Sequence, residues 1–315
     1  MTKAKSIFKN AKGELSTAIM LVILCIIFAV NSEYFLGIRN IMNIGSYASI
    51  MGTMAAGLTI AMLLGGLDVS QYSMAAMAGM IMGLMIENNW PVPVVIILTL
   101  CVGILGGAIN AFIVTIMKVN PIIATMGTQF VFRGIAFLLT DGRYIRIDND
   151  AYYFIGNGTV LGIPFCLLIM VATYIIVWYI LKYTTYGRQV YAVGGNAQVA
   201  TLAGINATKV KFISFMITGL TAVMGGIITV CQTSSAMPNH GYGNDMDGIA
   251  AVILGGIGLA GGKGKVGGTL IGILILAVLV NGMTLLNVQA YWQQVVKGLV
   301  LIFAVFIDSL RNARS

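Results

Sequence analysis

Long stretches without charge are the feature that most constrains what this chain can fold into. A helix that crosses a membrane needs about 20 mostly apolar residues. Stretches of at least that length without any Lys, Arg, Asp or Glu recur along the chain, at 40–67, 88–117, 151–181, 212–244 and 266–296. Their number predicts a protein that crosses a membrane many times.

The composition excludes the main soluble classes. Hydrophobic residues make up 58% of the 315 residues and charged residues 9%, whereas a typical soluble domain has about 25% charged residues. So few charges cannot cover the surface of a soluble enzyme, a disordered chain or a nucleic-acid-binding domain. The pI near 9.3 comes from basic residues in short loops, so we expect no nucleic-acid partner.

Charged residues and clusters of Gly, Pro and Asn interrupt the apolar stretches and mark the ends of the expected helices. They predict an all-α integral membrane protein, a polytopic bundle of about ten helices. The whole chain, 1–315, is expected to form one transmembrane domain. Eight spans with two re-entrant segments fit the charges nearly as well. The short third and the Gly-broken eighth segment are the weakest. The expected spans are 15–32, 42–64, 70–86, 92–117, 120–140, 162–181, 212–231, 247–262, 266–285 and 290–307.

The basic residues orient this bundle. If the N-terminal tail 1–14 is cytoplasmic, Arg39, Arg143 and Arg146 lie outside and far more basic residues lie inside, as the positive-inside rule requires. Both termini are then cytoplasmic. No small-x-small cleavage site follows the first span, which we expect to be retained. The inside set is Lys3, Lys5, Lys9, Lys12, Lys118, Lys182, Arg188, Lys209, Lys211, Lys263, Lys265, Arg311 and Arg314.

Signatures of catalysis and metal binding are weak. The single histidine, His240, lies in a polar loop and is interpreted as a solvated residue. The four cysteines lie in apolar stretches without a CxxC pair and are interpreted as small apolar side chains. The Gly-rich run 255–268 lacks the spacing GxxxxGK[ST] of a nucleotide-binding loop. We therefore expect no catalytic residue, metal or cofactor, and any ATP-driven work requires a partner chain.

Charged residues inside the spans cost roughly 3 kcal/mol each on insertion scales. Arg133 is the most central, and two interpretations stay open: a polar path shared with Gln129 one turn earlier, or a link to backbone carbonyls. Lys297 is expected to extend toward an interface. No chain of intramembrane acidic residues crosses the bilayer, which disfavours an ion-coupled carrier.

Acidic residues at helix ends allow two roles. Asp68 at the inner end of the second span either lines a path or caps the next helix together with Ser70. Asp245 and Asp247 precede the eighth span and are interpreted as helix caps. Two short segments, 64–69 and 254–259, place a Gly pair at similar points. They suggest either an internal repeat or a coincidence in a Gly-rich chain.

The inside loop 182–211 carries basic residues and no acidic one. Asn196 can cap a short helix that Gly204 ends. A short helix without basic or aromatic faces suits a groove on another protein better than a lipid surface.

Several motifs, taken together, resemble the ribose/xylose/galactose-type permease subunits of ABC importers over nearly the whole chain. The motifs are Gly65-Gly66-Leu67-Asp68-Val69-Ser70, Ala124-Thr125-Met126-Gly127-Thr128 with Arg133-Gly134, Tyr186-Gly187-Arg188, Ala192-Val193-Gly194-Gly195-Asn196 with Ala200, Gly204-Ile205, Ser235-Ala236-Met237-Pro238, Gly241-Tyr242-Gly243, Asp245-Met246-Asp247-Gly248-Ile249-Ala250-Ala251-Val252-Ile253-Leu254-Gly255-Gly256, Gly261-Gly262-Lys263-Gly264, Gly268-Thr269-Leu270-Ile271-Gly272 and Asn281-Gly282.

The resemblance implies a sugar-importing permease of the bacterial inner membrane that works as a homo- or heterodimer. Its partners would be cytoplasmic ATPases, which bind ATP and Mg²⁺, an extracytoplasmic sugar-binding protein and membrane lipid. The residues implied to face the ATPase are Arg188, Gly194, Gly195, Asn196, Ala200, Gly204 and Ile205. The candidates for the translocation path or for helix caps are Asp68, Ser70, Gln129, Arg133, Asp245, Asp247 and Asn281.

Two departures from the family pattern bear on specificity. Gln71-Tyr72 stands where the family often has Val-Gly, and Val199-Ala200-Thr201 stands where it often has Ala-Ala-Arg. The resemblance implies that the loss of that Arg removes a contact with the ATPase, so we expect a specialised choice of ATPase. The alternatives are a related importer of nucleosides or branched-chain amino acids and a stand-alone ion-coupled carrier.

Overall fold

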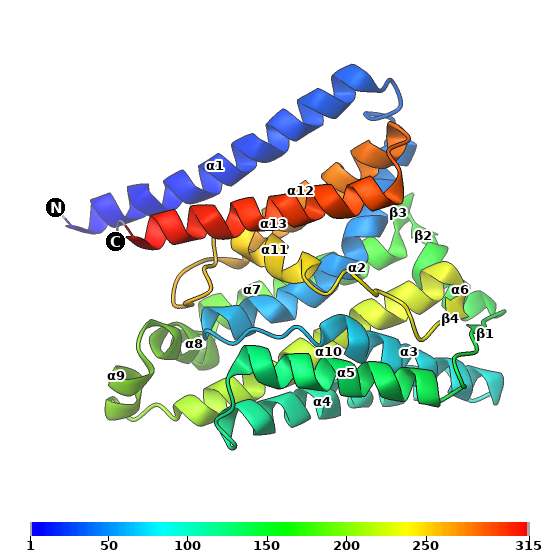
Figure 1. The fold of residues 1–315 in the computed structure, drawn as a ribbon, viewed down its shortest axis with the longest axis horizontal. Helices are drawn as coiled ribbons and strands as arrows, with labels where there is room; N and C mark the ends of the chain where they lie inside the picture. Colours follow the sequence, from blue (N-terminus) through cyan, green and yellow to red (C-terminus); the bar gives the residue numbers. More distant parts are fainter. Residues whose placement is uncertain (1, 314–315) are drawn as a thin grey trace.

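The computed structural model describes residues 2–313, with side chains for 17–306. Most of the chain forms long helices that run roughly alongside one another (Figure 1). The helices are α1 (Thr2–Asn31), α2 (Ile38–Leu63), α3 (Gln71–Glu87), α4 (Val92–Thr115), α5 (Pro121–Leu138), α6 (Asp150–Asn157), α7 (Phe165–Tyr183), α8 (Thr185–Gly195), α9 (Ala197–Leu202), α10 (Ala207–Thr233), α11 (Asp247–Leu254), α12 (Val266–Leu285) and α13 (Ala290–Ala313).

Six of the described helices, α2, α4, α5, α7, α10 and α12, are long and apolar enough to cross a membrane. Shorter apolar segments lie in α1 (Thr17–Asn31) and α13 (Ala290–Phe306), and α3 has 17 residues. The protein is thus an all-α integral membrane protein, as the sequence predicts.

The predicted span 247–262 is wrong. Its helix, α11, has eight residues, which at 1.5 Å per residue extend about 12 Å against a hydrocarbon core of about 30 Å. The chain then continues as an irregular, Gly-rich segment, 255–265.

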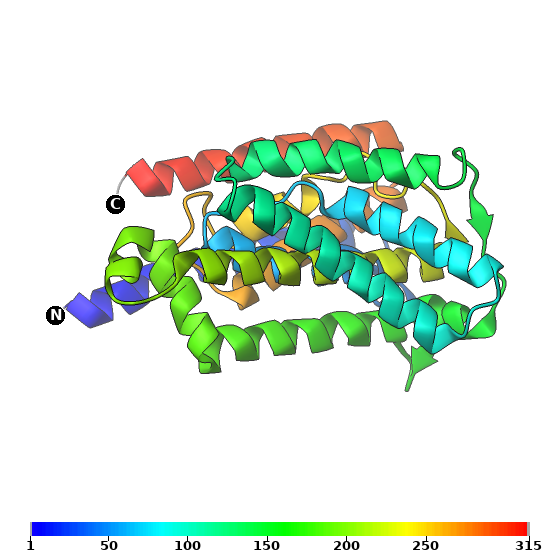
Figure 2. The ribbon, with the colours of Figure 1, turned by 90° about the horizontal axis from the view of Figure 1, so that it is seen from below.

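Helix α10 forms the centre of the bundle and packs against α2, α3 and α4; Figure 2 shows α4 crossing it. The crossing is close because glycines meet there. A Cβ atom built on Gly219 would overlap the carbonyl oxygen of Gly103 and lie 2.8 Å from the Cα of Gly107. Small residues at such crossings let two backbones approach and gain dispersion contacts in lipid.

The first turns of α1 and the last turns of α13 lie at the same end of the molecule as α8 and α9 (Figure 1). The expected tail 1–14 is not separate, because α1 begins at Thr2. At the opposite end (Figure 1), two short antiparallel ladders join β1 (Ile145–Arg146) to β4 (Ser235–Ala236) and β2 (Thr159–Val160) to β3 (Ile163–Pro164).

Candidate functional site

The loop between α7 and α10 folds into α8 and α9. The Asn196 side chain accepts hydrogen bonds from the backbone N–H groups of Gln198 at 2.9 Å and Val199 at 3.0 Å. Gly204 ends the segment with a φ of +85°, which suits glycine because it has no Cβ. The predicted cap and end of this short helix are therefore confirmed.

The predicted ATPase-facing residues do not all lie on one surface. Arg188, Gly195, Asn196 and Gly204 are exposed, Gly194 and Ile205 are half-buried, and Ala200 is buried at 4%.

Two residues that the sequence analysis missed are the most prominent apolar side chains of α9. Val199 is 60% exposed and Leu202 is 89% exposed. Their spacing of three residues places both on one face of a helix, and that spacing was the available signal.

A buried polar cluster occupies the break between α2 and α3. An Asp68 carboxylate oxygen accepts hydrogen bonds from the Ser70 backbone N–H at 2.9 Å and from the Ser70 hydroxyl at 2.6 Å. The Asn110 amide donates to the Ser70 hydroxyl at 2.8 Å, and the Thr128 hydroxyl donates to the Asn110 carbonyl oxygen at 2.6 Å. Asp68 is 1% exposed, so the cluster joins α3, α4 and α5 around a carboxylate.

Ser70 occupies the N-cap position of α3 but makes no side-chain cap hydrogen bond. Asp68 accepts from it instead. A cap by the Ser70 side chain is therefore wrong, whereas Asp68 accepts from the backbone N–H of this N-cap residue.

Helices α2 and α11 end in the same way. The Gly66 N–H donates to the Ala61 carbonyl and the Gly65 N–H to the Met62 carbonyl. Around Gly256, the Ile257 N–H donates to the Val252 carbonyl and the Gly256 N–H to the Ile253 carbonyl. Both are Schellman terminations around a glycine of positive φ. The glycine of positive φ is Gly65, the first of its pair, after α2 and Gly256, the second of its pair, after α11. The segments 64–69 and 254–259 therefore end their helices with an offset of one residue.

Arg133 holds the loop 237–246 against α3 and α5. Its guanidinium donates to the carbonyl oxygens of Pro238 and His240, both at 2.8 Å, and to the Ser73 hydroxyl at 3.2 Å. The predicted partner Gln129 is wrong, because the hydrogen bonds of Arg133 run to these groups. The alternative interpretation, a link to backbone carbonyls, is confirmed.

His240 is partly buried in this loop, so its predicted role as a solvated residue is wrong. Burial lowers the pKa of its imidazole, and the nearby Arg133 charge lowers it further. Burial raises the pKa of Asp245, and Arg133 opposes that rise.

The predicted role of Lys297 is also wrong, whereas Asp247 lies in the first turn of α11, where its charge favours the positive end of the helix dipole, but it is not the cap. The Lys297 ammonium group points inward, 2.7 Å from an Asp247 carboxylate oxygen and 2.9 Å from the Asn244 side-chain oxygen. The N-cap of α11 is Met246, without a side-chain cap hydrogen bond. Neither Asp245 nor Asp247 is therefore the N-cap residue.

Asn281 lies in a reciprocal amide pair. Its side-chain nitrogen donates to the Asn40 oxygen at 2.9 Å, and the Asn40 nitrogen donates back at 3.0 Å. The pair joins α2 to α12 and satisfies both amides within the bundle.

A recess of about 100 Å³ lies between α2, α3 and α10 beneath the loop 237–246. Most of its wall is apolar. The polar residues among those that line it are Tyr47, Tyr72, Thr229, His240 and Asn244. Hydroxyl, amide and imidazole groups next to aromatic rings can accept and donate hydrogen bonds to an uncharged polar molecule.

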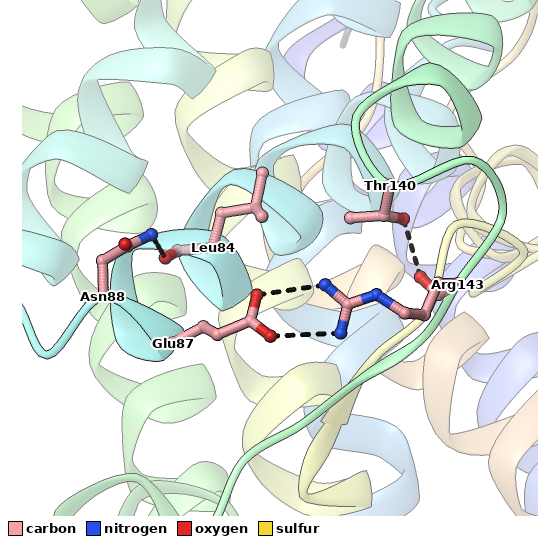
Figure 3. A network of polar contacts seen from close by, with 5 residues as sticks. All are labelled: Leu84, Glu87, Asn88, Thr140 and Arg143. Atoms are coloured by element: carbon pink, nitrogen blue, oxygen red, sulfur yellow. Dashed lines mark hydrogen bonds and ion pairs between the residues drawn. The ribbon is translucent and has the colours of Figure 1, made fainter.

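At the end distant from α8, a bidentate ion pair joins α3 to the loop after α5 (Figure 3). The Arg143 guanidinium donates to the two Glu87 carboxylate oxygens at 3.1 and 3.2 Å. The side chains are 58% and 42% exposed, so solvent screening keeps their contribution to stability small.

Comparisons with known proteins agree with this architecture. The sequence model of the family described as branched-chain amino acid transport system / permease component matches residues 40–305. No solved structure matches the chain significantly.

Curated relatives match over nearly their whole length. The chain is 40% identical to ribose import permease protein RbsC of Haemophilus influenzae over 92% of this chain and 91% of that protein. It is 38% identical to the RbsC protein of Bacillus subtilis, covering 97% and 96%. It is 34% identical to the L-arabinose transport system permease protein AraH of Escherichia coli, covering 95% and 90%. The chain therefore belongs to this family of ABC importer permeases, which are transport subunits of the membrane and not enzymes.

Proposed function

We propose that this chain is the permease subunit of a binding-protein-dependent importer of a monosaccharide, driven by a partner ATPase. The names of the relatives at 34–40% identity support a sugar as solute. The hydroxyl, amide and imidazole groups of the recess suit the hydroxyl groups of a sugar. The solute would pass this recess on its way across the bundle.

The observation that carries the coupling to an ATPase is the exposed face of α9. Val199 and Leu202 expose apolar surface on a short helix that Asn196 caps. Exposed apolar side chains on an ordered helix are suited to a groove on another protein. The end of the bundle that holds α8, α9 and both chain ends would face the cytoplasm, and the sugar-binding protein would dock at the end that holds β1–β4. A second permease subunit would complete the path.

The test is a mild-detergent pull-down of Leu202→Glu from the native membrane. A buried carboxylate in the ATPase groove is costly, so this variant should lose the co-purifying ATPase while its own level in the membrane stays normal. Leu161→Glu is the matched control, because Leu161 is 98% exposed in the turn between β2 and β3.

Retention of a stoichiometric ATPase by Leu202→Glu would contradict the proposed docking face. The ligand found in the co-purified binding protein identifies the solute. A nucleoside or branched-chain amino acid there would overturn the sugar assignment.

A further inference from the structure

Three backbone segments meet at the carbonyl group of Leu63, the last residue of α2. The Gly262 backbone N–H donates a hydrogen bond to this oxygen at 2.8 Å. A Cβ atom built on Gly194 would overlap the same oxygen, and one built on Gly262 would lie 2.8 Å from the carbonyl oxygen of Gly194. The end of α2, the segment after α11 and α8 are thus in direct backbone contact. Figure 1 shows α8 beside that end of α2.

A second contact joins α8 to the same segment. The Tyr191 hydroxyl donates to the Gly264 carbonyl oxygen at 3.1 Å. Tyr191 and Gly194 are three residues apart and lie on one face of the helix. Burial raises the pKa of the Tyr191 phenol, so the hydroxyl keeps its proton.

Both segments that meet α8 follow the end of a helix, since α2 ends at Leu63 and α11 at Leu254. Beyond Leu63 the chain leads to Asp68 and its polar cluster, and the segment 255–265 follows directly on α11, which begins at Asp247. Side chains hop between rotamers, whereas a contact between backbones cannot relax without moving the elements themselves. A shift of α8 would therefore displace the segments after α2 and α11 together.

We infer that Leu63, Gly194 and Gly262, with the Tyr191–Gly264 hydrogen bond, form a junction that transmits movement of α8 to the segments after α2 and α11 during transport. These are positioning residues that act through the segments they join. The inference rests on the proposed function, because it takes the docked ATPase as the source of the movement.

The test uses the complete transporter, purified with its ATPase and binding protein and placed in proteoliposomes. [¹⁴C]Ribose uptake and ATP hydrolysis are measured together. Gly194→Ala places a methyl group against the Leu63 carbonyl, and Tyr191→Phe removes one hydroxyl without changing the packing volume much. Each should raise the ATP consumed per ribose about fivefold or more, the scale of a typical coupling free energy. Gly267→Ala is the control, since a Cβ there meets nothing within 4 Å.

Three outcomes are distinguishable. A non-sugar ligand in the co-purified binding protein, with no uptake of ribose by the wild type, overturns the proposed sugar importer and not the junction, whose test then uses that ligand. An unchanged ATP-to-ribose ratio in both variants, even with lower thermal stability, means a purely structural contact and overturns the junction. Loss of the bound ATPase from Gly194→Ala would instead assign Gly194 to the docking face.

Discussion

The ammonium group of Lys297 on α13 lies 2.7 Å from the carboxylate of Asp247, the first residue of α11. The two side chains are 12% and 9% exposed. Two opposite charges removed from water need each other, because either one alone would carry an uncompensated desolvation cost. The pair therefore fixes the short helix α11 to α13.

Removal of one charge from this pair should destabilise the fold strongly. Lys297→Met leaves the Asp247 carboxylate buried without a counter-charge, at a cost of roughly 3–5 kcal/mol. The double variant Lys297→Met/Asp247→Leu should recover most of that loss. Thermal unfolding in detergent, followed by tryptophan fluorescence, checks both. The control is Lys263→Met, at an exposed position, and equal losses in the single and double variants would contradict the prediction.

The amide of Asn110 should be energetically coupled to the Asp68 carboxylate. Asn110→Leu removes the donor to Ser70 and the acceptor of Thr128, and each unsatisfied buried group costs about 1–3 kcal/mol. A double-mutant cycle with Asp68→Asn should give a coupling energy of about 0.5–3 kcal/mol. Thr115→Val on the same helix is the control, because its hydroxyl bonds within α4. Additive losses would refute a shared network.

Arg133 should order the loop 237–246. Arg133→Gln removes the guanidinium that donates to Pro238 and His240, and hydrogen bonds from a charged donor are worth about 1.5–3 kcal/mol each. Loop amides should then exchange hydrogen at least about tenfold faster by mass spectrometry. Gln129→Ala should leave exchange unchanged. Equal exchange in the two variants would mean that other contacts hold the loop.

His240 should make stability fall with acidification. Its pKa is lowered from 6.5 in the native state, so the native protein binds fewer protons than the unfolded chain. The contribution of His240 is then fully present above pH 6.5 and is lost as the pH falls through the native pKa.

The comparison of wild type with His240→Asn isolates this contribution. The raised pKa of Asp245 acts in the opposite direction, because its contribution is lost as the pH rises through its native pKa, and it is present in both proteins. Between pH 7.5 and 5.5 the unfolding temperature of the wild type should fall more than that of the variant. A parallel pH dependence in both would refute the role of His240.

Local patterns predicted most of the fold, and pairings between distant residues were missed. The apolar runs located α2, α4 and α7 because membrane length and hydropathy are properties of one segment. The Asn196 cap was predictable because a cap lies within three residues of the backbone N–H groups that donate to it. Arg133 reaches Pro238, 105 residues away, and no local pattern encodes that contact. The end of α11 was missed because hydropathy does not register where a Schellman glycine stops a helix.

The shortness of α11 also bears on how the protein is made. Helices α10 and α12 on either side of it are long and apolar and can enter the bilayer as they emerge during synthesis. A segment of eight helical residues cannot satisfy its backbone polar groups alone in lipid. We expect the stretch from 234 to 265 to be the last part of the chain to fold, after its long neighbours have inserted and formed the surface against which it packs.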